Sequence, residues 1–64
     1  MTQQQTFLIL LGNQNKTHFA KKHNISRRAV YNWISGDNIS NSTLSEMATK
    51  EGYKLSINLK LEKL

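Results

Sequence analysis

The apolar positions of this 64-residue chain follow one spacing as far as residue 52 and another spacing after it. Up to residue 52 the apolar side chains recur roughly every three to four positions, which is the period of a helix with one buried face. From Tyr53 to Glu62 they alternate with polar side chains, which is the period of a strand with one buried face. The pattern therefore predicts a mainly α-helical domain that is followed by one β-strand.

Capping and turn residues divide the first part of the chain into helices. The first predicted helix begins near Thr2, includes the apolar run FLILL and stops at Gly12, although a short apolar run also suits a strand. A second helix has Asn15 or Thr17 as its cap and runs to about His23.

The third predicted helix follows a turn at Asn24, because asparagine readily adopts a positive φ angle. Ser26 is its predicted cap and Gly36 its end. Its inner face, at helical spacing, consists of Ala29, Val30, Trp33 and Ile34. A stacking role for the tryptophan is the alternative, but the spacing favours the core.

The fourth predicted helix follows a polar loop at positions 36–41 and ends at Gly52. Ser42 or Thr43 is its predicted cap. Its inward-facing residues are Leu44, Met47 and Ala48. Residues 1–52 are thus expected to form a compact four-helix domain.

The strand predicted from the alternating pattern raises the question of its partner, because a single strand leaves its backbone groups unpaired. No second alternating stretch is evident in the sequence. We therefore predict that residues 53–64 are a dimerisation element that pairs with its copy, antiparallel, in a homodimer. Pairing with the N-terminal segment, or packing against the helices, is the alternative. The predicted contact residues are Tyr53, Leu55, Ile57, Leu59 and Leu61.

Charge is distributed unevenly along the chain, whose formal net charge is +5. Residues 1–36 contain five Lys and Arg side chains and no acid, whereas residues 37–64 contain four bases and four acids. A local excess of positive charge in so small a domain suggests a polyanionic partner, although a solvated basic face is the plainer interpretation.

Several classes of protein are disfavoured by the composition. The chain has no cysteine, so disulfides and thiolate metal sites are excluded, and its two histidines alone do not predict a metal or other cofactor. Its longest apolar run is too short to span a membrane, and no basic residue precedes it as in a secretory signal. We therefore expect a cytoplasmic protein. No nucleophile–base set or glycine-rich phosphate loop predicts an enzyme.

The segment KTHFAKKHNISRRAVYNWISG has a small residue, a turn residue and apolar residues at the offsets of a helix-turn-helix. Those positions hold Ala20, Asn24, Ile25, Val30 and Trp33. The segment resembles the helix-turn-helix of lambda-repressor and Cro-type (XRE-like) regulators, and the resemblance covers about residues 4–52. The following strand is similar to the dimerising strand of Cro-type proteins. Asparagine at 24 in place of the family's usual glycine, and lysine at 16 where glutamine is frequent, are departures from the pattern.

The resemblance implies that the third helix enters the major groove of double-stranded DNA with its N-terminal half. The residues expected to read bases are Arg27, Arg28, Tyr31 and Asn32, because arginine can bind guanine and asparagine can bind adenine through two hydrogen bonds. The residues expected to contact phosphates are Lys16, Thr17, Lys21, Lys22, Ser26, Asn38, Ser40 and Asn41.

These expectations describe a sequence-specific transcriptional regulator, a dimeric repressor of a phage, plasmid or other mobile element in a bacterial cell. Its operator would be roughly palindromic. An antitoxin or another protein-interaction module that uses the same fold is the alternative.

Overall fold

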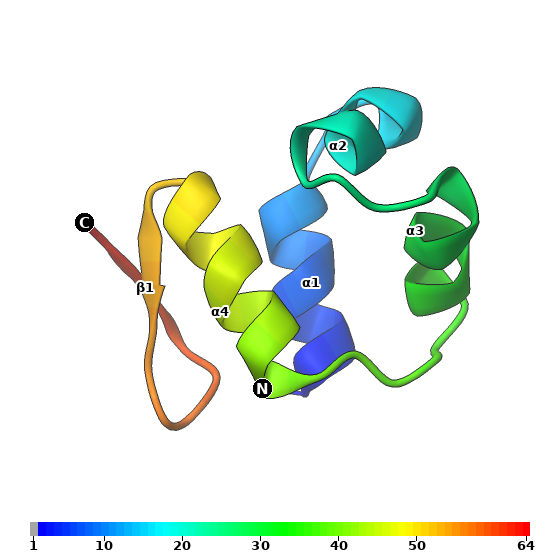
Figure 1. Cartoon of the computed structure of the whole chain (residues 1–64). Coiled ribbons are helices and arrows are strands. Elements are labelled where there is room, and N and C mark those ends of the chain that lie inside the picture. The colour runs from blue at the N-terminus through cyan, green and yellow to red at the C-terminus, as the bar shows by residue number, and fades with distance from the viewer. Residues whose placement is uncertain (1) are drawn as a thin grey trace.

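The computed structural model describes residues 2–64, and over this range it contains four helices followed by a two-stranded antiparallel sheet (Figure 1). The elements are α1 (Gln3–Leu11), α2 (Lys16–Lys22), α3 (Arg27–Ile34), α4 (Asn41–Lys50), β1 (Tyr53–Leu55) and β2 (Leu61–Lys63). The prediction of a mainly helical domain is confirmed, and the apolar run FLILL belongs to a helix rather than to a strand.

Each helix begins after a side chain whose oxygen accepts a hydrogen bond from a backbone N–H group of the first turn. These caps are Thr2, Asn15, Ser26 and Ser40. The predicted cap of α4, Ser42 or Thr43, is wrong by two to three positions. Ser40 competes successfully because Ile39, just before it, is buried in the same apolar cluster as Leu44, which holds the chain at the angle from which the helix starts.

The core lies between the helices and is centred on aromatic side chains. Phe7 of α1 is fully buried and makes edge-to-face contacts with Phe19 of α2, at 5.8 Å between ring centroids, and with Trp33 of α3, at 5.4 Å. The assignment of Trp33 to the inner side of its helix is therefore confirmed. Val30 and Leu44 are also fully buried, so α1 to α4 each contribute to one core.

The C-terminal part differs from its prediction, because residues 53–63 form a hairpin and not one continuous strand. β1 and β2 pair directly, with Leu55 opposite Leu61. The turn between them is closed by hydrogen bonds from Ser56 N–H to the carbonyl of Lys60, at 2.9 Å, and from Leu59 N–H to the carbonyl of Ser56, at 3.0 Å. Leu59 has a φ angle of 61°, a left-handed conformation that leucine rarely adopts.

The length of the turn explains why the alternating pattern concealed it. The turn consists of residues 56–60, an odd number, so every pair in the register joins two odd-numbered or two even-numbered positions. Residues directly opposite one another in an antiparallel pair face the same side of the sheet. The apolar positions therefore keep their alternation through the turn without any change of phase. A pattern of period two cannot distinguish this hairpin from one long strand.

The hairpin directs most of the predicted dimer contacts toward its own chain. The aromatic and leucine members of that set, Tyr53, Leu55, Leu59 and Leu61, are partly buried against the core. Ile57 lies in the turn and is 98% exposed. The backbone of the turn is also fastened to α1, because the buried hydroxyl of Thr6 donates a hydrogen bond to the carbonyl of Leu59 at 2.9 Å. Packing against the helices, the alternative prediction, is what the structure has, whereas pairing between two chains stays a prediction.

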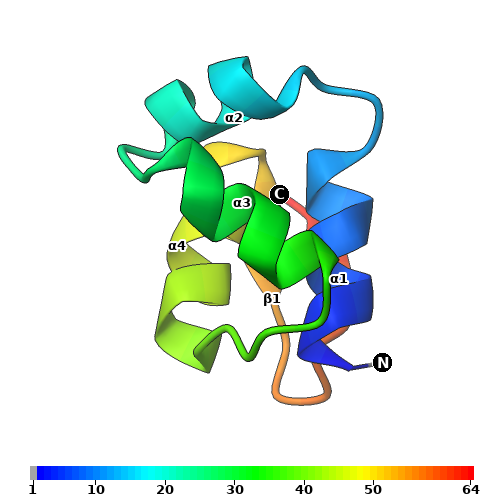
Figure 2. The ribbon, with the colours of Figure 1, turned by 90° about the vertical axis from the view of Figure 1, so that its right-hand side faces the viewer.

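The hairpin and α3 lie on opposite sides of the molecule (Figure 1). α4 and α1 separate them, with β1 packed on α4 and α3 packed on α1 and α2. In the view of Figure 2, α3 runs across the front of the molecule with α2 above it, so one side of α3 faces away from the rest of the protein.

Candidate nucleic-acid interface

The outer side of α3 carries only polar side chains and one tyrosine. Its N-cap Ser26 accepts a hydrogen bond from the N–H of Ala29 at 3.1 Å, which starts the helix at Arg27. Val30 is buried and Ala29, Trp33 and Ile34 are partly buried, as the spacing predicts. The four residues predicted to read bases are all exposed on this helix: Arg27, Arg28, Tyr31 and Asn32.

A turn stabilised by backbone hydrogen bonds sets the position of α3 relative to α2. Asn24 has a φ angle of 55°, which confirms the positive φ predicted for this residue. The N–H of Ile25 donates to the carbonyl of Ala20 at 2.9 Å, and Ala20 is 3% exposed. A small side chain at position 20 lets the chain pass close to α2 on its way to α3.

Most of the basic side chains near α3 have no acidic partner. The ion pairs found among residues 2–64 all involve Glu51, so Lys16, Lys21, Arg27 and Arg28 are free of them. Each of these residues is exposed. Their charge is available to a molecule outside the chain. Phosphate and carboxylate groups are the anions that lysine and arginine side chains bind.

Lys22 differs from the other predicted phosphate ligands. Its ammonium group lies 2.8 Å from the carboxylate of Glu51 and donates a hydrogen bond to Gln14 Oε1 at 2.7 Å. Its charge is therefore already satisfied within the chain. An external phosphate would have to compete with Glu51 for Lys22, so its predicted role as a phosphate ligand stays a prediction.

The remaining predicted phosphate ligands are polar residues at helix starts and in the loop before α4. Ser26 uses its hydroxyl oxygen as a cap acceptor, which leaves its hydroxyl hydrogen free to donate. Ser40 is also a cap acceptor, but its hydroxyl shares hydrogen bonds with the hydroxyls of Thr43, at 2.8 Å, and Ser42, at 3.3 Å. Thr17, Asn38 and Asn41 are exposed. The loop that follows α3 runs along the lower part of the side that faces the viewer in Figure 2.

Tyr31 brings two of the cations together. Tyr31 is 47% exposed, and the centroid of its ring lies 5.9 Å from Lys16 Nζ and 5.9 Å from Arg27 Cζ. A cation close to an aromatic ring is attracted by the negative potential of the ring. The start of α2 and the start of α3 are thereby connected by side chains as well as by the core.

Glu51, His23 and Gln14 form a polar cluster with Lys22 that the sequence did not reveal. His23 is buried, its Nε2 donates to Glu51 Oε2 at 2.7 Å, and its ring packs on Phe19 with centroids 4.3 Å apart. Gln14 Nε2 donates to Glu51 Oε1 at 3.0 Å. No spacing rule joins residues 14, 22, 23 and 51.

The carboxyl group of Glu51 is only 11% exposed and ionises more readily than usual. Burial by itself raises the pKa of Glu51, but hydrogen bonds from Lys22, His23 and Gln14 and the charge of Lys22 outweigh it, so the pKa is lowered. This cluster connects the loop after α1, the end of α2 and the end of α4. Side-chain hydrogen bonds thus join three segments that are far apart in the sequence.

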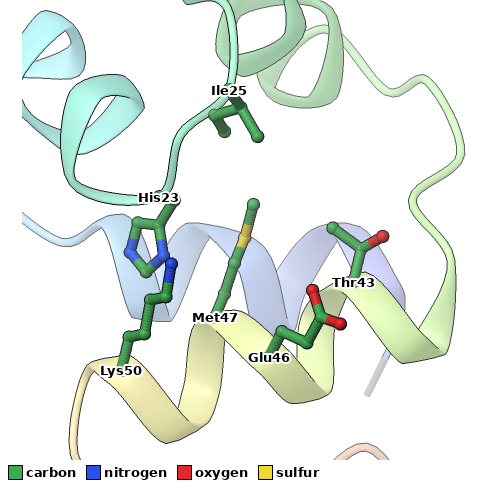
Figure 3. Close-up of a pocket in the computed structure, with 6 residues that line it drawn as sticks. All are labelled: His23, Ile25, Thr43, Glu46, Met47 and Lys50. Carbon is green, nitrogen blue, oxygen red and sulfur yellow. The ribbon is translucent and has the colours of Figure 1, made fainter.

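A pocket of about 50 Å³ lies between the turn after α2 and the side of α4. Figure 3 shows His23 and Lys50 at one end, Thr43 and Glu46 at the other, and Met47 pointing toward Ile25 between them. Its size suits water rather than a substrate. Within residues 2–64, no three His, Cys, Asp or Glu side chains are grouped closely enough to hold a metal ion.

The exposed side of α3, and not the pocket, is therefore the candidate site for binding a partner molecule. None of the helices in residues 2–64 has the length and apolar character required to cross a membrane. Comparison of the chain with protein-family models, curated proteins and solved structures found no match.

Proposed function

We propose that this protein binds double-stranded DNA in a sequence-specific manner and regulates transcription. In this proposal α2, the turn at Asn24 and α3 act as a helix-turn-helix, with α3 in the major groove. The observation that carries the proposal is the outer side of α3, where Arg28 and Asn32 are both exposed and Arg28 forms no ion pair within residues 2–64. Arginine and asparagine are the side chains that bind guanine and adenine through two hydrogen bonds.

The distribution of charge agrees with this proposal. Residues 1–36 carry the whole net charge of +5, and α3 lies within them. Positive charge near the recognition helix provides affinity for any duplex, whereas contacts with base edges provide sequence preference. The proposed roles are base contacts from Arg28 and Asn32, and phosphate contacts from Lys16 and Lys21.

A dimer that binds a roughly palindromic operator and represses by covering a promoter is the finer part of the proposal. Less evidence supports the dimer than the sequence suggested. β1, which was predicted to pair with another chain, pairs with β2 of its own chain. Two features still favour association. A two-stranded sheet leaves an outer edge on each strand, and Ile57 projects from the turn with 98% exposure.

The experiment that tests DNA binding is selection of bound sequences from random duplex DNA, with the stoichiometry of the selected complex determined by sedimentation. A reproducible motif is the expected result, and a two-fold symmetric motif bound by two chains would support the dimer. Binding that depends on salt but selects no motif would overturn sequence-specific recognition.

Two variants test the assignment of residues in the same experiment. Arg28→Ala should weaken the selected site by about 1–3 kcal/mol and relax the preference at one base pair. Lys21→Ala should weaken all sequences alike and reduce the dependence of affinity on salt by about one unit of log–log slope. If both variants weakened all sequences alike, Arg28 would not be a base-reading residue.

A further inference from the structure

Three side chains from two helices meet beside the start of α3. Lys16 is the first residue of α2, Arg27 is the first residue of α3, and Tyr31 lies one helical turn after Arg27. The ammonium nitrogen of Lys16 and the guanidinium carbon of Arg27 each lie 5.9 Å from the centroid of the Tyr31 ring. We call these three residues the Tyr31 cluster.

The electrostatics of the Tyr31 cluster are unbalanced within the protein. Two positive charges approach the same ring, and neither forms an ion pair within residues 2–64. Each cation gains only a weak attraction from an exposed aromatic ring. An anion within reach of both flexible side chains would attract each of them more strongly.

The chemistry of the three groups suits a phosphodiester. A guanidinium group can donate two parallel hydrogen bonds to phosphate oxygens, and an ammonium group binds them as a compact charge. The phenol hydroxyl of Tyr31 can donate a further hydrogen bond. Base edges, in contrast, offer no negative charge that would bring a lysine and an arginine to one point.

We propose that Lys16, Arg27 and Tyr31 together hold a single phosphate group of the DNA backbone. This inference rests on the proposed function. Tyr31 acts in it as a positioning residue, since its ring orients both cations before DNA is bound. Arg27 and Tyr31 thereby leave the set of base-reading residues predicted from the sequence, and Arg28 and Asn32 remain.

The proposal also assigns a role to the contact between the two helices. The phosphate would be held by α2 and α3 jointly, so it would fix the position of α3 along the groove. Contacts of this kind determine register without reading sequence. Substitutions in the Tyr31 cluster should therefore change affinity for all sequences and leave the preferred motif unchanged.

The test uses the selected site and copies of it in which one phosphate at a time is replaced by an uncharged methylphosphonate. One position should weaken binding of the unmodified protein about tenfold or more, as expected for a lost charge-assisted contact. Lys16→Ala and Arg27→Ala should each bind the natural site more weakly and become insensitive to substitution at that same position. Lys60→Ala, which changes an exposed lysine in the hairpin turn, is the matched control and should respond as the unmodified protein does.

Two substitutions at position 31 test the positioning role. Tyr31→Phe retains the ring and should keep most of the sensitivity to the critical phosphate. Tyr31→Leu removes the ring and should lose most of it. Melting of each variant, followed by circular dichroism, verifies that the helices remain folded.

The outcomes separate the inference from the proposed function. Suppose that the unmodified protein selects a motif, but that Lys16→Ala and Arg27→Ala lose their sensitivity at two different phosphates. The shared phosphate site would then be wrong, and the proposed DNA binding would stand. A change of the preferred base pair in Arg27→Ala would do the same, and equal losses in Tyr31→Phe and Tyr31→Leu would overturn the positioning role. If the unmodified protein selects no motif at all, the proposed function fails, and this inference fails with it.

Discussion

The lysines at the two ends of α2 differ in whether they form an ion pair within the protein. At the first residue of the helix, the exposed side chain of Lys16 approaches the Tyr31 ring and forms no ion pair within residues 2–64. At the last residue, Lys22 is bound by the partly buried carboxylate of Glu51 and by Gln14. The same type of side chain is left available at one end and is used for internal stability at the other.

This difference separates two tasks within one short helix. Charge that serves an external partner has to stay unpaired, and it therefore contributes little to stability. Charge that is paired inside the chain stabilises the fold but is lost to the partner. Predictions for variants at the two ends should thus differ in which property changes, stability or binding.

The largest expected effect is at the paired end. Glu51→Ala removes the acceptor of His23, Lys22 and Gln14 and should lower the free energy of unfolding by about 2–3 kcal/mol. Urea denaturation followed by circular dichroism measures the change. Glu46→Ala, which removes an exposed glutamate of the same helix, is the control and should stay within about 0.5 kcal/mol of the unmodified protein. An equal loss in both variants would show that the cluster adds nothing to stability.

The next effect concerns binding at the unpaired end. Lys16→Ala should weaken affinity for duplex DNA by about 1–2 kcal/mol, because a contact with a charged phosphate is lost, while its unfolding free energy hardly changes. Lys22→Ala should lower stability by up to about 1 kcal/mol and leave affinity nearly unchanged. Parallel titrations with labelled DNA and urea curves measure both quantities. If Lys22→Ala bound DNA more weakly than Lys16→Ala, the proposed difference between the two ends of α2 would be wrong.

Acidification should reduce the contribution that Glu51, at the paired end of α2, makes to the free energy of unfolding. The pKa of Glu51 is lower in the folded chain than in the unfolded one, so its stabilising contribution is complete above the unfolded pKa of about 4.3 and disappears as the pH falls through the lower folded pKa. The difference in unfolding free energy between the unmodified protein and Glu51→Gln should therefore shrink below about pH 4.5. Denaturation series from pH 3 to 7, about one unit apart, measure it. A constant difference over this range would contradict the shift.

The smallest effect is expected at Lys21, which is adjacent to Lys22 yet has no ion pair within residues 2–64. Lys21→Ala should change the free energy of unfolding by less than about 0.5 kcal/mol, since only a favourable interaction with the end of the helix dipole is lost. The melting temperature of this variant, measured beside that of Lys22→Ala, tests whether pairing with Glu51, and not position on the helix, causes the difference.

The features that sequence analysis predicted correctly depend on residues close together in the chain. The turn at Asn24, the cap at Ser26 and the buried side of α3 follow from spacing within about one or two helical turns. The start of α4 was missed because Ser40, Ser42 and Thr43 are all able to cap, and only the burial of Ile39 decides among them.

The features that were missed depend on residues far apart or on an ambiguous period. Glu51 and Gln14 are 37 positions apart, and no local pattern indicates their hydrogen bond. The hairpin was read as one strand because both structures have apolar residues at every second position. The inner face of α3 was predicted from helical spacing, but the approach of Lys16 to Tyr31 depends on how α2 and α3 are placed in space.

The odd length of the hairpin turn has a consequence for how this chain can vary over evolutionary time. Insertion or deletion of one residue within 56–60 would leave Leu55 and Leu61 able to pair and to face the same side, because directly opposite residues share a side whatever the length of the turn. It would, however, break the alternation of apolar and polar positions along the sequence, whereas a change of two residues would keep it. In related chains that retain this hairpin, a turn of even length should therefore be recognisable from the sequence, and a turn of odd length should not.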